Sequence, residues 1–200
     1  MNFFYPPQPT RLWPSSSFFQ HQLRYDDDWD AEIKYNGWRV QIHKYKNQLL
    51  IYNRHATLID INPTIFENAL SVFPDNSIFD GELIDRRTKD LKNIIVLWDC
   101  MFFDDNDIRK LPLKERRPFL EPLKYAPVSL KSKSKGQVFR AKPHSKNIVK
   151  FYDNVIERDN DLEEGIVIKN INSPYEYSLK SKKETANWYK IRKIGEHALV

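Results

Sequence analysis

The 200-residue chain has little cysteine and no long hydrophobic run. A single cysteine, Cys100, excludes an intramolecular disulfide and a multi-cysteine metal cluster, and it favours an intracellular protein. Cys100 lies in the apolar run 94–103, which predicts a buried, unreactive thiol. No window of 18 apolar residues occurs, and residues 1–14 lack the pattern of a signal peptide. We therefore expect neither a membrane span nor secretion.

Glycine is also scarce, with five in the whole chain. Gly37, Gly81 and Gly165 each lie within a short segment that contains charged residues. Glycine permits close approach of the backbone to a ligand, so these positions predict ligand-binding turns. Tight hairpins are the alternative explanation for any one of them.

The composition, at 40% hydrophobic and 30% charged residues, is that of a globular protein with one domain. The net charge of +5 and the pI near 9.1 favour an anionic partner such as a nucleic acid. A basic protein without such a partner would have the same charge.

Alternating apolar residues predict a half-buried strand over 38–45, followed by a hairpin into 49–54. Further strands are expected at 77–85, 94–103, 166–169 and 187–192, and helices at 63–73, 113–120 and 147–157. This mixture indicates an α+β fold with antiparallel sheets. Residues 1–24 are expected to form an extended lead-in that packs through Phe3, Phe4, Tyr5, Leu12 and Trp13, and residues 25–200 to form the domain.

Five short charged or aromatic motifs follow one another along the chain. They are Lys34-Tyr35-Asn36-Gly37-Trp38-Arg39, Asp80-Gly81-Glu82, Trp98-Asp99, Glu164-Gly165-Ile166-Val167-Ile168-Lys169 and Trp188-Tyr189-Lys190-Ile191-Arg192. Each motif is common by chance. Their joint occurrence in this order is a much stronger signal.

In this order the motifs resemble the covalent nucleotidyltransferase superfamily, which comprises ATP-dependent polynucleotide ligases and mRNA capping enzymes. The chain is most similar to the adenylation domain of ATP-dependent DNA ligases, on the stretches 98–104, 111–117 and 173–176 and on Tyr35. The resemblance implies two mainly antiparallel sheets, flanked by helices, around a nucleotide cleft. Members of this superfamily normally continue into an OB-fold domain, and because residues 25–200 are taken up by the adenylation domain, we expect a possible separate OB-fold domain or subunit.

The resemblance also implies a role for each matching residue. Lys34 would be the nucleophile that forms lysyl-AMP. The nucleotide would be bound by Glu32, Arg39, Arg54, Glu82, Trp98, Lys169 and Lys190, with Trp98 stacking on adenine and Arg54 near the phosphates or the nick. Glu82 and Glu164 would hold Mg²⁺, which prefers oxygen ligands. A lysine attacks only as the free amine, so we expect Lys169, Lys190, Arg39 and the metal to lower its pKa.

Residues 131–150 contain seven Lys and Arg and no acidic residue, and a second basic cluster precedes Trp188. We expect contacts to a nucleic-acid backbone from Lys131, Lys133, Lys135, Lys180 and Lys182, together with Arg54. A solvated basic loop is the alternative.

Two positions depart from the ligase pattern: Asn36 stands where aspartate is usual, and Arg192 where lysine is common. The sequence favours an ATP- and Mg²⁺-dependent DNA ligase domain that acts on nicked duplex DNA (or RNA) as a monomer. Two alternatives stay open. One is an RNA ligase or a capping guanylyltransferase, and the other is a non-catalytic nucleic-acid-binding module with the same fold.

Overall fold

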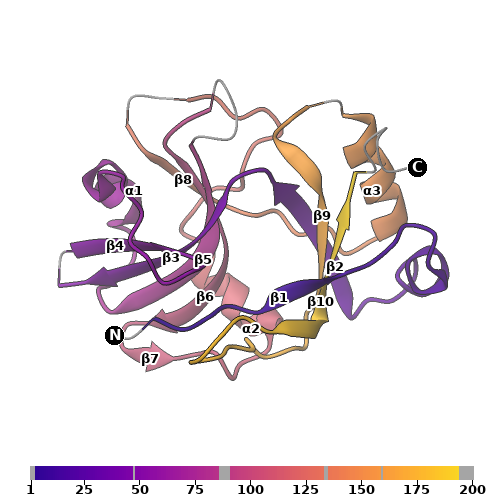
Figure 1. Ribbon diagram of the computed structural model, residues 1–200, viewed down its shortest axis with the longest axis horizontal. Helices are drawn as coiled ribbons and strands as arrows, with labels where there is room; N and C mark the ends of the chain where they lie inside the picture. The colour runs from indigo at the N-terminus through magenta and orange to yellow at the C-terminus, as the bar shows by residue number, and fades with distance from the viewer. Residues whose placement is uncertain (1–2, 47, 86–90, 133–134, 159, 194–200) are drawn as a thin grey trace.

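The computed structural model describes residues 3–46, 48–85, 91–132, 135–158 and 160–193. Its strands form two sheets, and the cavity described below lies between them (Figure 1). Neighbouring strands are antiparallel except for two pairs, so the expected α+β fold with two mainly antiparallel sheets is confirmed.

The four-stranded sheet has the order β1-β10-β9-β2. Its strands are β1 (Gln8–Arg11), β10 (Glu184–Arg192), β9 (Glu163–Asn170) and β2 (Trp29–Tyr35). The strands predicted at 166–169 and 187–192 are the cores of β9 and β10. Strands β1 and β2 were not predicted, although β2 carries the expected nucleophile Lys34.

The six-stranded sheet has the order β4-β3-β5-β6-β7, with β8 paired to β6. Its strands are β3 (Trp38–Tyr45), β4 (Gln48–Asn53), β5 (Ser77–Ile84), β6 (Ile94–Phe103), β7 (Asn106–Asp107) and β8 (Gln137–Arg140). The strand predicted at 38–45 from alternation is β3, and the strand predicted at 94–103, an apolar run, is β6. Cys100 on β6 is fully buried, and burial raises the pKa of its thiol, as expected for an unreactive cysteine.

Helices and short helical turns pack on both sheets. Helix α3 (Ile148–Glu157) packs Ile148, Phe151 and Val155 against the apolar face of β2 and β9 (Figure 1). A 3₁₀ turn (Pro63–Phe66) and α1 (Glu67–Leu70) pack on the six-stranded sheet. Helix α2 (Leu113–Arg116) continues into a 3₁₀ turn (Arg117–Leu120). The three helices predicted from sequence therefore occur, two of them as short composite turns.

The N-terminal segment crosses from one sheet to the other (Figure 1). Strand β1 pairs in parallel with β10, while the carbonyl oxygens of Phe4 and Pro7 accept hydrogen bonds from Gln41 and Arg39 of β3. Phe4 is buried, as predicted. The prediction for Trp13 is wrong: its side chain is 52% exposed, and its ring lies against the guanidinium of Arg11 at 3.7 Å. The domain boundary at residue 24 stays a prediction.

A short π-helical segment (Phe18–Gln22) connects the N-terminal segment to β2, so this part of the expected extended lead-in is helical. Among the described residues, none of the helices has the length and apolar character needed to cross a membrane.

Candidate active site

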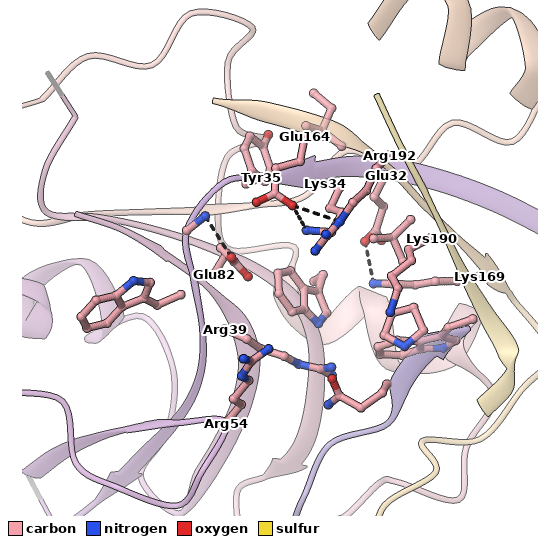
Figure 2. Close-up of a pocket in the computed structure, with 18 of the residues that line it drawn as sticks. Glu32, Lys34, Tyr35, Arg39, Arg54, Glu82, Glu164, Lys169, Lys190 and Arg192 are labelled. Carbon is pink, nitrogen blue, oxygen red and sulfur yellow. Dashed lines mark hydrogen bonds and ion pairs between the residues drawn. The ribbon is translucent and has the colours of Figure 1, made fainter. Parts of the chain in front are cut away.

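A cavity of about 370 Å³ lies between the two sheets. Strands β2, β9 and β10 line it on one side, and β3, β5 and β6 on the other (Figure 2). Every residue that the ligase resemblance placed at the nucleotide lines this one cavity. They are Glu32, Lys34, Arg39, Arg54, Glu82, Trp98, Glu164, Lys169 and Lys190.

Strand pairing places the side chains of the four-stranded sheet in rows. Residues directly opposite each other on neighbouring strands project from the same face, and every second residue along a strand does so as well. The three rows on the cavity side are Asp30–Lys169–Trp188, Glu32–Val167–Lys190 and Lys34–Gly165–Arg192. Motifs that are about 130 and 155 residues apart in sequence therefore meet at adjacent positions.

Gly165 is required beside Lys34. Its φ is +144°, a backbone conformation that residues with a side chain rarely adopt. A Cβ atom at this position would lie 2.0 Å from the carbonyl oxygen of Ile191 on β10. The glycine therefore lets β9 and β10 approach closely where they flank the nucleophile.

Trp98 enters the cavity at an irregularity in β6. Gly81 of β5 pairs with Leu97, but the adjacent Asp80 pairs with Asp99, so Trp98 is the extra residue of a β-bulge. Alternation along β6 places Trp98 on the face of Val96, opposite the face that holds Leu97, and from there it lines the cavity. The bulge takes effect after Trp98, because Cys100 lies on the same face as Leu97 although the two are three residues apart.

Lys34 and three charged residues form one end of the cavity. The Nζ atom of Lys34 makes an ion pair with Glu164, and the Nε atom of Arg192 lies 3.7 Å from the same carboxylate. Glu82 approaches from the opposite sheet, and its Oε1 atom accepts a hydrogen bond from the backbone N–H of Gly37 at 3.1 Å (Figure 2). Burial raises the pKa of Glu82 to about 7, with a further contribution from the charge of Glu164 and opposing contributions from Lys34 and Arg39.

The cations expected to lower the pKa of Lys34 are largely neutralised by other residues. Lys169 is buried, and its Nζ atom lies 2.6 Å from Oε2 of Glu32. Burial lowers the pKa of Lys169, although Glu32 opposes this effect. Arg39 binds the buried carboxylate of Asp80 through two hydrogen bonds of 3.0 and 2.6 Å. Lys190 also lies on the cavity-facing rows, and no carboxylate of the described residues lies within salt-bridge distance of it. Burial lowers the pKa of Lys190.

Three basic side chains meet at the mouth of the cavity. Arg54 and His55 line the cavity, and the Nζ atom of Lys182 lies 3.1 Å from Nδ1 of His55. Lys182 and Arg54 both lower the pKa of this histidine. The structure therefore brings two of the predicted nucleic-acid contacts together.

The other predicted contacts lie elsewhere. Lys131, Lys135 and Lys180 are exposed and do not line the cavity, and Lys133 lies outside the described residues. The segment around Lys131 packs on the turn between β5 and β6, where the Oγ atom of Ser132 accepts a hydrogen bond from the Lys92 backbone.

Sequence reasoning missed several residues that do not line the cavity but bind the side chains that do, or the acids next to them. Arg117 binds both Asp30 and Glu32, and Arg116 binds Asp99 with both side chains fully buried. The hydroxyl of Tyr175 donates to Asp80 at 2.8 Å. The Glu-Arg-Arg sequence at 115–117 was noted as similar to ligases, but nothing in it indicated which acids the arginines bind.

Asn36 has a defined place in the turn between β2 and β3. Its Nδ2 atom donates to the carbonyl oxygen of Asp161 at 3.0 Å, and its backbone N–H donates to Leu162. A carboxylate could not donate the first of these bonds. The asparagine therefore matches its surroundings in this chain.

A sequence profile described as "ATP dependent DNA ligase domain" matches residues 16–93 and 85–192. The chain belongs to this family. It is 28% identical over 168 residues to the DNA ligase of vaccinia virus (strain Ankara), covering 73% of this chain and 29% of that protein. It is 27% identical over 184 residues to the SPbeta prophage-derived DNA ligase-like protein LigB of Bacillus subtilis (strain 168). This match covers 83% of this chain and 62% of that protein.

The fold is that of ligase nucleotidyltransferase domains. The structure of mycobacterial DNA ligase D complexed with ATP and MES matches with a TM-score of 0.67 at 15% identity. The match covers 96% of this chain and 61% of that one. This ligase domain thus spans less than two thirds of the relatives named here.

Proposed function

We propose that this domain reacts with ATP to form a covalent lysyl-AMP at Lys34 and transfers the AMP to the 5′-phosphate of nicked DNA. The observation that carries the proposal is the arrangement around one cavity. A lysine, two carboxylates and two further cations surround one end, and the rest of the lining combines aromatic and aliphatic side chains with further charged groups such as Glu32, Lys169 and Arg39. Membership of the ligase family supports the same reaction.

The base fits the end of the cavity that holds Trp98 and Val167. These two side chains come from opposite sheets, so a flat ring between them would contact an aromatic face on one side and an aliphatic side chain on the other. Stacking of a base on an aromatic ring contributes about 1–3 kcal/mol. The phosphates would then extend toward Lys34, Lys190 and Arg192.

The first step forms a bond between the Nζ atom of Lys34 and the α-phosphorus as the bond to the bridging α–β oxygen breaks. Pyrophosphate leaves, and the amine loses its proton. The ion pair between Lys34 and Glu164 must open before the amine reaches phosphorus. Arg192 lies in the same cross-strand row as Lys34, and Lys190 lies in the adjacent row. Both are therefore placed to stabilise negative charge on the phosphate oxygens.

Glu82 and Glu164 suit a magnesium ion. Their mutual repulsion contributes to the raised pKa of Glu82, and a divalent cation between them would relieve it. Mg²⁺ usually binds one or two protein carboxylates together with water and substrate phosphates, so two glutamates would be sufficient. When bound, the ion would neutralise charge on the nucleotide phosphates.

Arg54, His55 and Lys182 support a DNA substrate. They present basic groups at the entrance of the cavity, where an incoming 5′-phosphate would approach the lysyl-AMP. Lys182→Ala should weaken binding of nicked DNA and lower the salt dependence by about one phosphate contact. Lys110→Ala, which changes an exposed lysine that does not line the cavity, should not alter it.

The proposal is tested by incubating the domain with Mg²⁺ and α-labelled ATP or GTP and separating the protein on a denaturing gel. We expect label from ATP in the wild type and none in Lys34→Ala. Label from GTP alone would favour a guanylyltransferase. No label in any condition, including with an OB-fold domain supplied in trans, would favour a binding module. Sealing assays on nicked DNA and nicked RNA then distinguish the two substrates.

A further inference from the structure

Arg117 connects two acidic residues beneath the cavity. It follows the last residue of α2, and its guanidinium makes two contacts to Asp30, one of them from Nη2 to Oδ1 at 2.8 Å. The same Nη2 atom lies 2.7 Å from Oε1 of Glu32. Asp30 and Glu32 are alternate residues of β2, so one planar guanidinium spans the spacing of two side chains on one face.

Glu32 therefore has a cation on each carboxylate oxygen. Arg117 contacts Oε1, and Lys169 contacts Oε2 at 2.6 Å. Glu32 is 3% exposed, and burial alone would raise the pKa of its carboxyl group. The charges of Lys169 and Arg117 nevertheless hold the pKa of Glu32 below its ordinary value. Two acids and two cations thus form a compact, neutral group.

Glu32 reaches the cavity but Arg117 does not. Glu32 lines the cavity wall beside Val167, its partner on β9, whereas Arg117 lies behind it. Each carboxylate oxygen has two lone pairs, and the contacts from Arg117 and Lys169 use one on each oxygen. An acceptor remains available to a ligand in the cavity, and the two cations fix its position.

We propose that Arg117 is a positioning residue that makes the base-binding end of the cavity select a purine with an amino group at position 6. The inference rests on the proposed function and deepens it. An ionised carboxylate can only accept hydrogen bonds, so it favours the amino donor of adenine and repels the carbonyl acceptor of guanine or hypoxanthine. Without Arg117, Glu32 would lose one of its two anchors and could rotate or take up a proton.

ATP and ITP provide the test, because ITP carries a carbonyl in place of the 6-amino group. The rate of adduct formation at Lys34 is measured by mass spectrometry over a range of each nucleotide. We expect wild-type protein to prefer ATP in kcat/KM by more than about tenfold. Arg117→Gln should reduce this preference at least about fivefold, mainly by raising KM for ATP.

A neighbouring residue supplies the matched control. Arg116 occupies the same turn but binds Asp99, so Arg116→Lys should leave the ATP/ITP preference unchanged even where it lowers stability. Glu32→Gln should reduce the preference by itself. Adding Arg117→Gln to Glu32→Gln should then cause no further reduction, because both act through one carboxylate.

The outcomes separate the two proposals. If the wild type forms no adduct with either nucleotide, the proposed function fails. If the wild type reacts and a folded Arg117→Gln variant keeps the ATP/ITP preference, the role of Arg117 is overturned. Should Arg117→Gln not fold, Arg117→Lys keeps one charge but cannot span both acids. An unchanged preference in that variant would overturn the proposal equally.

Discussion

Glu82 should make the stability of the free domain fall as the pH rises. Its carboxyl group is buried, and its pKa is raised from 4.5 to about 7. Between these values the unfolded chain loses the proton while the folded protein keeps it, so the unfolded state is increasingly favoured as the pH rises through this window. At about 1.4 kcal/mol for each pH unit, the loss amounts to about 3 kcal/mol by pH 8.

The assay is urea unfolding of wild type and Glu82→Gln from pH 4 to pH 8, without Mg²⁺. Because glutamine does not titrate, the stability of the variant relative to wild type should rise by about 3 kcal/mol across this range and then level off. Glu157→Gln, which changes an exposed glutamate of α3, should show no such trend. A constant difference between wild type and Glu82→Gln would refute the reasoning. Mg²⁺ at pH 8 should stabilise wild type more than Glu82→Gln.

Three further substitutions test the supports of the cavity. Trp98→Ala should raise the Kd for ATP about tenfold by calorimetry through loss of base stacking, whereas Trp13→Ala, at an exposed ring outside the cavity, should have no effect. Gly165→Ala should lower the free energy of unfolding by at least about 2 kcal/mol, because β9 and β10 must move apart beside Lys34. The same movement should slow adduct formation. A variant with wild-type stability and rate would contradict this. Arg116→Met should cost about 3–5 kcal/mol in urea unfolding by leaving the Asp99 carboxylate buried and unpaired, and adding Asp99→Asn should restore part of the loss.

Strands and helices with a single apolar face could be predicted from the sequence. The alternation of Val40 and Ile42 with polar residues predicts β3, and the spacing of Ile148, Phe151 and Val155 predicts α3. In both elements the apolar residues are the ones buried against the core, and the periodicity of apolar residues in a sequence indicates such burial. The bounds of β6 were predicted instead from a continuous apolar run, because this strand is buried on both faces.

Strand β2 carries the same alternation of apolar and charged residues as β3 and was overlooked in the sequence. What the sequence could not show is that its charged face is buried as well, because Arg117 and Lys169 neutralise Asp30 and Glu32. A sequence shows the charges but not their distant partners. Strand β1 contains Pro9 and pairs in parallel with a strand some 175 residues later, a contact that no local pattern reports.

The candidate site was predicted more completely than the structure around it. The ordered motifs identified the residues that line the cavity, including Lys34, Glu82 and Glu164. They did not reveal that Lys169 and Arg39 are already paired with acids, because that depends on side-chain geometry. They also did not reveal the β-bulge at Trp98, after which Cys100 lies on the same face as Leu97.

The most direct test of the central claim is peptide mapping after incubation with ATP and Mg²⁺. The account predicts a mass increase of one AMP moiety on the peptide that contains Lys34, and its loss in Lys34→Ala but not in Lys110→Ala. An AMP moiety on Lys190 or another lysine, or no adduct with the cavity residues intact, would contradict it.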